Sequence, residues 1–445
     1  MTRTADKPLT RLRLRADRTL LHEEGACLPL RSRHGRCTAC ADACPVGALA
    51  VTVDAVNLSE TCTGCGRCTA SCPTQALSLP EVDALLATPP PTAPLRIECR
   101  MVPDDWLVPG SAVLPCLGAL TPGLLLARAA AGVPVELVDR GWCATCPACG
   151  VPASAGAARG AAGAVQATDA AVADAPHPAA AALEAAVLWL QAVGAGSLAP
   201  AGDAGPSAPA APAPVLRREP LPATLRPAAL PPAPTGAEPL DRRRFFGAAL
   251  ARPAGRERLG APAGATPMGG DGRAAYPADA RHPAPERARQ LAALQLLAAA
   301  HDSAVPADFF PQLHADARCC DRRMCVALCP TAALTAADDA VRAQLRFDPA
   351  RCIACGTCVR ACPEGALALA PHGGAAQVQT LATHHRRRCA GCGDVFTPAD
   401  EVAAVDGAAD EPAASAEAAH ALCPACTKSR RFMADARRQL FGALN

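Results

Sequence analysis

The chain has 445 residues, including 25 cysteines and few aromatic residues (8 Phe, 3 Trp and 1 Tyr), so we expect several domains and exclude large aromatic-rich cores. Its formal net charge of +2 gives no general attraction to nucleic acid or to a membrane surface. The N-terminal residues lack the apolar segment of a secretion signal and the cysteines form tight C-x-x-C groups, which predicts a reduced, cytoplasmic metal protein and not a disulfide framework.

Two cysteine runs, each followed by proline, come first along the chain. The second has the complete spacing C-x₂-C-x₂-C-x₃-C-P of bacterial iron–sulfur proteins, with Cys62, Cys65, Cys68 and Cys72. The first run has only the last three cysteines, which are Cys37, Cys40 and Cys44. His34 stands where its first cysteine is expected. Between the runs, the alternating residues 48–59 predict a β-hairpin.

The complete run lets its first three cysteines surround one cluster while the fourth ligates the neighbouring cluster. Crossed ligation predicts one cluster on Cys44, Cys62, Cys65 and Cys68. The other cluster then uses Cys37, Cys40 and Cys72, and it needs one more ligand. We favour Cys27, ten residues before Cys37, because a longer loop can bring it round and thiolate suits a cubane better than imidazole. His34 is the alternative, since imidazole ligates iron in Rieske centres.

An α/β domain is predicted over 93–196. Its strands are expected at 95–99, 111–118 and 133–139. A helix over 121–132 begins with Thr121 as its cap and Pro122 at its first position. If the strands are parallel, their carboxyl ends bring together Cys116, Cys143, Cys146 and Cys149, with Cys99 as a fifth candidate. A helix over 179–194, with Trp189 in the core, is expected to pack on this unit, and its apolar stretch is too short to span a membrane.

Residues 197–285 are rich in Ala and Pro, a composition that buries too little apolar surface to order itself. We expect a low-complexity linker there, with one short helix at 241–250. An amphipathic helix over 286–301 then leads into an internal repeat, because residues 325–369 parallel residues 37–79.

The repeat again holds two cysteine runs. Its second run is complete, with Cys352, Cys355, Cys358 and Cys362, and crossed ligation adds Cys329 to the first three of these. The other run has Arg322 in place of its second cysteine and retains Cys319, Cys325 and Cys329. Its cluster is predicted to use Cys319, Cys325 and Cys362. We expect Cys320 to complete it, and Asp321 is the alternative ligand.

The C-terminal region, 384–445, contains two C-x-x-C pairs formed by Cys389, Cys392, Cys423 and Cys426. Four thiolates suit structural zinc in a ribbon-like module. Rubredoxin-type iron would use the same geometry, but the aromatic residues that pack around such iron are missing. The last residues are expected to form a basic amphipathic helix, which is either a solvated face or a docking surface.

The cysteine runs resemble those of bacterial two-cluster [4Fe–4S] ferredoxins, and the chain as a whole resembles a polyferredoxin. The resemblance implies an α+β fold in which residues 1–82 and 286–372 are ferredoxin-like dicluster domains carrying about four [4Fe–4S] clusters. Related ferredoxins that lack the cysteine missing at Arg322 can carry [3Fe–4S]. More weakly, residues 93–150 resemble the small iron–sulfur subunit that joins hydrogenases to heterodisulfide reductases. That likeness implies a [2Fe–2S] cluster, with zinc or a free dithiol as alternatives.

The expected function is the relay of single electrons between redox protein partners, without a catalytic constellation. The chain lacks a P-loop motif, a G-x-G-x-x-G fingerprint and the C-x₃-C-x₂-C motif of radical-SAM proteins, so electrons are expected to enter and leave through partners. By resemblance, a formate dehydrogenase or a hydrogenase is such a partner. Two other hypotheses are a redox-sensing or assembly factor that uses the zinc ribbon, and a thiol enzyme built on Cys143 and Cys146.

Overall fold

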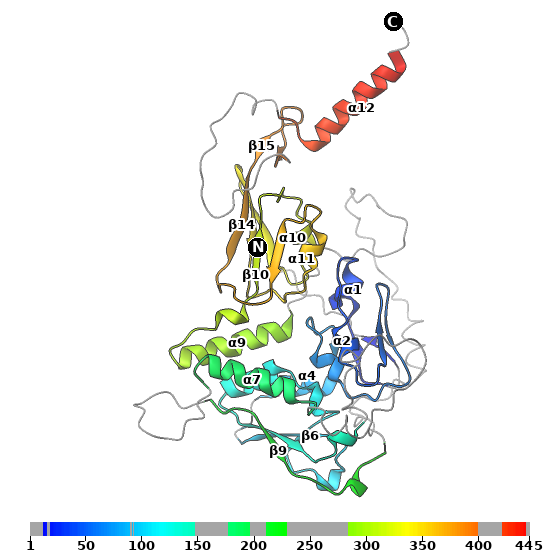
Figure 1. The fold of residues 1–445 in the computed structure, drawn as a ribbon, viewed down its shortest axis with the longest axis vertical. Coiled ribbons are helices and arrows are strands. Elements are labelled where there is room, and N and C mark those ends of the chain that lie inside the picture. Colours follow the sequence, from blue (N-terminus) through cyan, green and yellow to red (C-terminus); the bar gives the residue numbers. More distant parts are fainter. Residues whose placement is uncertain are drawn as a thin grey trace, which may run out of the picture.

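The computed structural model describes residues 12–15, 18–89, 91, 93–146, 177–195, 211–228, 284–398 and 421–441 (Figure 1). Helices and strands are mixed along the chain, which agrees with the predicted α+β class. The predicted helix at 241–250 lies outside the described residues.

The N-terminal unit consists of short elements around two cysteine pockets. Its antiparallel sheet has the order β1 (Leu12–Arg13), β2 (Leu21–His22), β5 (Leu77–Ser78). Its short helices are α1 (Leu28–Arg31), α2 (Ala39–Asp42) and α3 (Arg67–Ala70). The predicted hairpin is confirmed as β3 (Leu49–Val51) and β4 (Val56–Leu58), paired antiparallel.

A four-stranded parallel sheet forms the middle of the chain. Its order is β7 (Ala112–Leu114), β6 (Leu95–Cys99), β8 (Val135–Asp139), β9 (Val215–Arg218). The helices near it are α4 (Pro80–Ala87), α5 (Pro122–Ala130) and α7 (Ala180–Ala192). The predicted cap is confirmed, because Thr121 Oγ1 accepts a hydrogen bond from the backbone N–H of Leu124 at 3.4 Å. All three predicted strands are also present.

Strand β9 corrects the prediction of a linker without regular structure, which is wrong for residues 211–228. Polar contacts fix this stretch, since all four residues of β9 are exposed. Arg96 donates to both carboxylate oxygens of Glu219, at 2.7 and 2.9 Å, and Trp142 Nε1 donates to the carbonyl of Leu221 at 2.9 Å. Ion pairs and hydrogen bonds to the parallel sheet replace the apolar burial that the local composition lacks.

Helix α9 (Pro285–Ala300) connects the middle of the chain to the second repeat. It packs against α5 and α7, as Figure 1 shows. Glu286 at its start accepts a hydrogen bond from the backbone N–H of Gly123 at 2.6 Å, which satisfies a free donor in the first turn of α5. Trp189 of α7 is partly buried and packs edge-on against Phe309, with ring centroids 5.3 Å apart. These contacts join the two parts through one continuous apolar core.

The second repeat has its own core and a larger set of strands. Strands β10 (Gln312–Ala315) and β13 (Leu367–Ala370) pair antiparallel, and a second antiparallel sheet has the order β11 (Leu334–Asp338), β12 (Arg342–Phe347), β14 (Gln379–His385). Its helices are α10 (Met324–Leu328) and α11 (Thr357–Ala361). Strand β14 lies beyond residue 372, so the sheet of this unit extends past the end predicted for the second dicluster domain.

The C-terminal part contains the short pair β15 (Arg387–Arg388) and β16 (Val395–Phe396), followed by α12 (Pro424–Phe441). Helix α12 extends away from the other elements in Figure 1. Phe432 and Met433 on this helix are 70% and 56% exposed. Among the residues that the structure describes, no helix is both long enough and apolar enough to cross a membrane.

Replacing Leu294 by Ala should destabilise the protein, because this side chain on α9 is fully buried in the core shared with α5 and α7. We expect a loss of about 2–5 kcal/mol in the free energy of unfolding, measured by urea titration. Leu296→Ala on the same helix is the control, since Leu296 is 64% exposed. Equal effects of the two substitutions would contradict the described packing of α9.

Candidate iron–sulfur and metal sites

Most of the cysteines in the described part of the chain converge in groups. We name four groups after the four cysteine runs and a fifth group the middle site. Cys149 lies outside the described residues, so its predicted role has no structural counterpart here.

Site 2 is a pocket near the start of α3. The thiols that line it are Cys44, Cys62, Cys65 and Cys68. Apolar side chains, among them Leu20, Leu49 and Leu79, surround these thiols. The pocket therefore contains three cysteines of the second run and the last cysteine of the first run, which is the grouping expected for crossed ligation.

Site 1 is the matching pocket of the first run. The thiols that line it are Cys27, Cys37, Cys40 and Cys72. His34 is not among the lining residues. Its carbonyl instead accepts a hydrogen bond from Arg360 Nε at 2.8 Å. The structure thus brings Cys27, and not His34, to the position that the first run leaves open.

The loop from Cys27 to Cys37 folds back on itself to achieve this. Helix α1 forms its first half, and Gly35 then lies against the carbonyl of Leu28. A Cβ atom at residue 35 would come within 2.1 Å of that oxygen, so only glycine fits without a shift of the backbone.

Burial and mutual repulsion set the electrostatics of site 1. Desolvation by burial raises the pKa of Cys27 to about 12, and the neighbouring Cys72 and Cys37 add to the rise. The pKa of Cys40 is also raised to about 12, again first by burial and then by Cys72 and Cys37. Four thiolates in such a pocket need a compensating positive charge, and cluster iron supplies one. The donor set and its apolar surroundings therefore fit a sulfur-ligated cluster.

Site 4 gathers the complete run of the second repeat, with Cys352, Cys355, Cys358 and, from the third run, Cys329. Burial raises the pKa of Cys352 to about 12, and nearby Cys355 and Cys329 contribute. The pKa of Cys358 is raised for the same reason, with Cys355, Cys352 and Cys329 as its nearest charged neighbours. The grouping matches the one predicted from crossed ligation.

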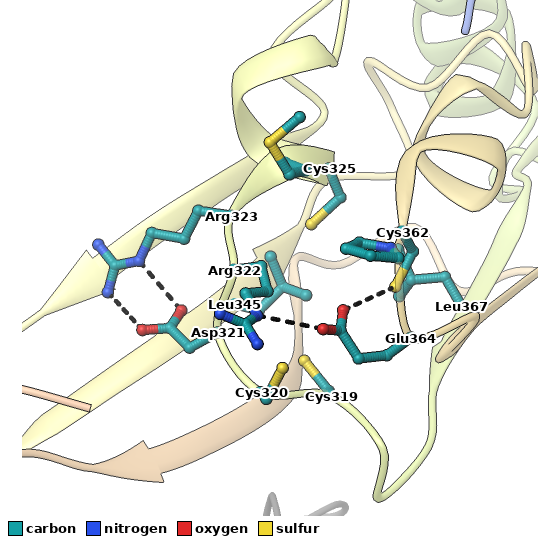
Figure 2. Close-up of a pocket in the computed structure, with 12 residues that line it drawn as sticks. Cys319, Cys320, Asp321, Arg322, Arg323, Cys325, Leu345, Cys362, Glu364 and Leu367 are labelled. Atoms are coloured by element: carbon teal, nitrogen blue, oxygen red, sulfur yellow. Dashed lines mark hydrogen bonds and ion pairs between the residues drawn. The ribbon is translucent and has the colours of Figure 1, made fainter. Parts of the chain in front are cut away.

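Site 3 is the pocket shown in Figure 2. Cys319, Cys325 and Cys362 line it, and Cys319 and Cys362 contribute to the raised pKa of Cys325, whose largest cause is burial. Cys320 also lines the pocket and hydrogen-bonds to Glu364, while the alternative ligand Asp321 pairs with Arg323. Only three thiols of this site, those of Cys319, Cys325 and Cys362, match cysteine positions in the complete runs.

The middle site lies where the parallel strands end. Its thiols are Cys99, which ends β6, Cys116, which follows β7, and Cys143 and Cys146, which follow β8. Burial raises the pKa of Cys99 to about 12, and Cys143 and Cys146 are the charged neighbours that raise it further. The expected convergence at the carboxyl edge of the sheet is present, and Cys99 belongs to it.

A buried ion pair fixes the two strand ends that carry these thiols. Glu98 is fully buried, and its Oε2 accepts hydrogen bonds from Nε and Nη2 of Arg140 at 2.9 and 2.6 Å. Its other oxygen accepts from the backbone N–H of Val108 and from Ser111 Oγ, both at 3.0 Å. The carboxylate is thereby fully paired, as a buried charge must be. Cys99 is the next residue after Glu98, so the pair holds β6 against the end of β8.

His177 contacts the middle site from the start of α7. Its Nε2 lies 3.5 Å from Cys143 Sγ, and its Nδ1 accepts a hydrogen bond from the backbone N–H of Ala179 at 3.2 Å. Because Nδ1 is an acceptor, a neutral ring carries its proton on Nε2 and donates toward the sulfur. This arrangement does not suit a general base for Cys143, which weighs against the thiol-enzyme hypothesis.

The C-terminal cysteines form a compact four-thiol group. The sulfur atoms of Cys389, Cys392, Cys423 and Cys426 lie within 4.8 Å of one another. The sulfurs of Cys392 and Cys423 are 3.8 Å apart, which is about the edge of a tetrahedron with zinc–sulfur bonds of about 2.3 Å. Backbone N–H groups of Cys423 and Gly391 donate to Cys389 Sγ at 3.2 and 3.3 Å. The donor set fits one tetrahedral metal ion.

Comparison with protein-family models finds the 4Fe-4S binding domain at residues 58–78 and 345–368. The chain carries two 4Fe-4S binding domains. The matched segments contain the complete second and fourth runs, and with the cysteine content they support an iron–sulfur, ferredoxin-like protein. Such domains are typical of electron-transfer proteins. A search of curated proteins finds no match to the chain.

Some residues near these sites were not found from the sequence. Arg360, Glu364, Glu98 and Arg140 belong to no sequence motif. Nothing in the sequence distinguishes them from other charged residues. His177 lies next to an Ala-rich stretch, with no cysteine and no second histidine nearby in the sequence. Cys99 could be predicted as a member of the middle site because it ends a predicted strand.

Substituting Cys27 by Ser should remove one cluster, because it takes away one of the four thiols that line site 1. We expect a loss of about four irons per chain in anaerobically purified protein. His34→Ala is the matched control and should leave the iron content unchanged. Loss of iron in the histidine variant alone would contradict the placement of site 1.

Substituting Cys423 by Ser should release the metal of the C-terminal group, since three thiols bind a tetrahedral ion far less tightly than four. Zinc measured by mass spectrometry should fall by about one ion per chain, because the C-terminal group fits one tetrahedral ion. The iron content should stay the same, and a joint loss of iron would contradict an independent metal module.

Proposed function

We propose that the protein relays single electrons through sulfur-ligated clusters that stand in single file. The observation that carries the proposal is the spatial order of the five sites, which is site 3, site 4, site 1, site 2 and the middle site. This order differs from the order of the runs along the chain, because the sites of the second repeat lie at one end of the series and those of the first repeat lie between them and the middle site.

The first two steps run from site 3 to site 4, within the second repeat, and from site 4 to site 1 of the first repeat. Cys325 of site 3 is a charged neighbour of Cys358 in site 4. Cys355 of site 4 is in turn a neighbour of Cys37 in site 1, and it adds to the rise in the pKa of Cys37 that burial begins. Thiols of sites 4 and 1, in different repeats, are therefore neighbours.

The last two steps continue through the N-terminal unit. Cys40 of site 1 is a charged neighbour of Cys68 in site 2. Cys65 of site 2 packs against Cys116 of the middle site, and both side chains are buried. Short steps favour electron transfer, because tunnelling falls steeply with distance.

The junctions between units use equivalent corners of the clusters. Cys37, Cys65 and Cys355 each stand at the second position of the C-x₂-C-x₂-C-x₃-C spacing. In site 3 this position is Arg322, whose side chain is 59% exposed. Site 3 and the middle site are thus the two ends of the file, and each end is available to a separate redox partner.

The partners we propose are oxidoreductase subunits, for which formate dehydrogenase and hydrogenase are the candidates suggested by the resemblance of the cysteine runs. We place the protein in the cytoplasm, where free thiols persist. In this role the chain acts on no substrate of its own. The protein groups tune each cluster by burial and by hydrogen bonds to sulfur, as His177 does at Cys143.

Anaerobic purification with determination of iron, sulfide and zinc, followed by EPR of the reduced protein, tests the proposal. Four cubane clusters correspond to about sixteen irons per chain. We also expect magnetic interaction between neighbouring reduced clusters. Protein that contains zinc but no iron, when prepared anaerobically, would refute the relay.

Replacing Arg360 by Ala should weaken the junction between the two repeats. Arg360 donates to the carbonyls of His34 and Cys355, both at 2.8 Å, and so holds the loops of sites 1 and 4 together. Losing these hydrogen bonds should cost about 1 kcal/mol at this exposed position. We expect the magnetic interaction between sites 1 and 4 to decrease and electron transfer between the repeats to slow several-fold, measured by EPR and by freeze-quench reduction.

The control for this variant is Arg342→Ala, on the exposed face of β12. Both variants should keep the full iron content. An unchanged interaction between the clusters in the Arg360 variant would show that the junction does not depend on this side chain.

A further inference from the structure

Site 3 lacks one thiol that the complete runs have, at the second position of the cysteine spacing. We call this position the open corner of site 3. Arg322 occupies the position of Cys65 and Cys355, and its side chain, which is 59% exposed, pairs with Glu364. The run retains Cys319 and Cys325, and Cys362 comes from the fourth run; Figure 2 shows these three side chains together with Cys320. A four-iron cluster there needs one more anionic donor, and the residues that line the pocket offer Cys320, Asp321 and Glu364.

Asp321 is already fully engaged. Arg323 donates to its two carboxylate oxygens, at 3.0 Å to Oδ1 and 2.8 Å to Oδ2. Thr397 Oγ1 donates to Oδ2 at 3.0 Å. Both oxygens thus face Arg323 and Thr397, and in Figure 2 the carboxylate lies on the far side of Arg322 from Cys362.

The loop conformation keeps Asp321 in this place. Arg323 has φ 60°, the left-handed conformation that Gly66 and Gly356 adopt at the same position of the complete runs. This conformation is unfavourable for a residue with a Cβ atom. The side chain of Arg323 also pairs with Asp338 on β11, at 2.7 and 3.0 Å. These paired contacts stabilise the loop and turn the Asp321 carboxylate toward Arg323.

Glu364 has the opposite placement. Its carboxylate lies inside the pocket in Figure 2, between Arg322 and Cys362. Arg322 Nε is 3.1 Å from Oε1, and Cys362 Sγ is 4.0 Å from Oε2. Its side chain is only 23% exposed. Both carboxylate oxygens therefore lie among the groups that border the position of the missing cysteine.

Cys320 is the other candidate at this corner. It follows Cys319 directly in the chain, and in Figure 2 its sulfur lies beside that of Cys319. The Glu364 carboxylate, in contrast, lies between Arg322 and Cys362.

We propose that Glu364 is the fourth ligand of site 3 and that the iron it holds is exchangeable. A carboxylate is a harder donor than a thiolate, and it holds iron in a sulfur cluster less tightly. The iron leaves and returns as Fe²⁺, so the four-iron and three-iron forms interconvert with no net oxidation. The inference rests on the proposed function only in taking site 3 to hold a cluster.

The position of the open corner links iron exchange to electron transfer. It is the exposed end of the file of sites, where an electron from one partner enters or leaves. Iron at the corner changes the potential of the outermost cluster. Electron flow through the protein would therefore follow the availability of Fe²⁺.

The test compares Glu364→Gln with Cys320→Ser in the full chain. Each protein is purified anaerobically, incubated with excess Fe²⁺, desalted, oxidised with ferricyanide and examined for iron content and for the EPR signal of [3Fe–4S]. The glutamine variant should lose about one iron per chain and show the three-iron signal, while the serine variant should keep the fourth iron. Glu364→Cys should bind the fourth iron firmly and lose the signal.

Other outcomes overturn the inference. A three-iron signal in Cys320→Ser, with none in Glu364→Gln, would identify Cys320 as the ligand. Identical behaviour of both variants and the parent would show that neither side chain closes the corner. Iron at sites 1, 2 and 4 serves as the internal reference in every sample, because its absence from the parent protein would refute the proposed function and not this inference alone.

Discussion

The sharing of cysteines between paired runs is the constraint on which the rest of the structure depends. Cys44 lies with the thiols of the second run and Cys72 with those of the first, so neither pocket is complete without the other. The second repeat exchanges Cys329 and Cys362 in the same way. The two halves of each unit must therefore fold together, and the short helices and hairpins between the runs only need to span that fixed distance.

Packing through three helices then sets the order of the sites. Helix α9 lies on α5 and α7, so the second repeat returns toward the N-terminal unit although a long stretch of sequence separates them. The Glu98–Arg140 pair fixes the strand ends on the other side, where the middle site meets Cys65. A continuous file of thiol sites results from apolar packing at the centre and from one buried ion pair at the end.

The sequence was sufficient where spacing or periodicity carried the information. The hairpin at 48–59, the strand before Cys99 and the cap at Thr121 follow from local patterns. Cys27 is expected at site 1 from loop length, and Cys72 from crossed ligation. Strand β9 was missed because its contacts to Arg96 and Trp142 exist only in the folded protein. Glu364 was missed for the same reason, since nothing local distinguishes it from a surface glutamate.

Helix α1 gives the incomplete first run a second use. A C-x₂-C loop is too short to do more than surround its cluster, whereas the loop from Cys27 to Cys37 has room for a helical turn and for the carbonyl of His34 that Arg360 contacts. Figure 1 shows α1 beside α11 of the other repeat. The residues between Cys27 and Cys37 thus also carry a contact between the two ferredoxin-like repeats. A longer loop between two cysteines can join a duplicated module to its copy while both thiols stay in one pocket.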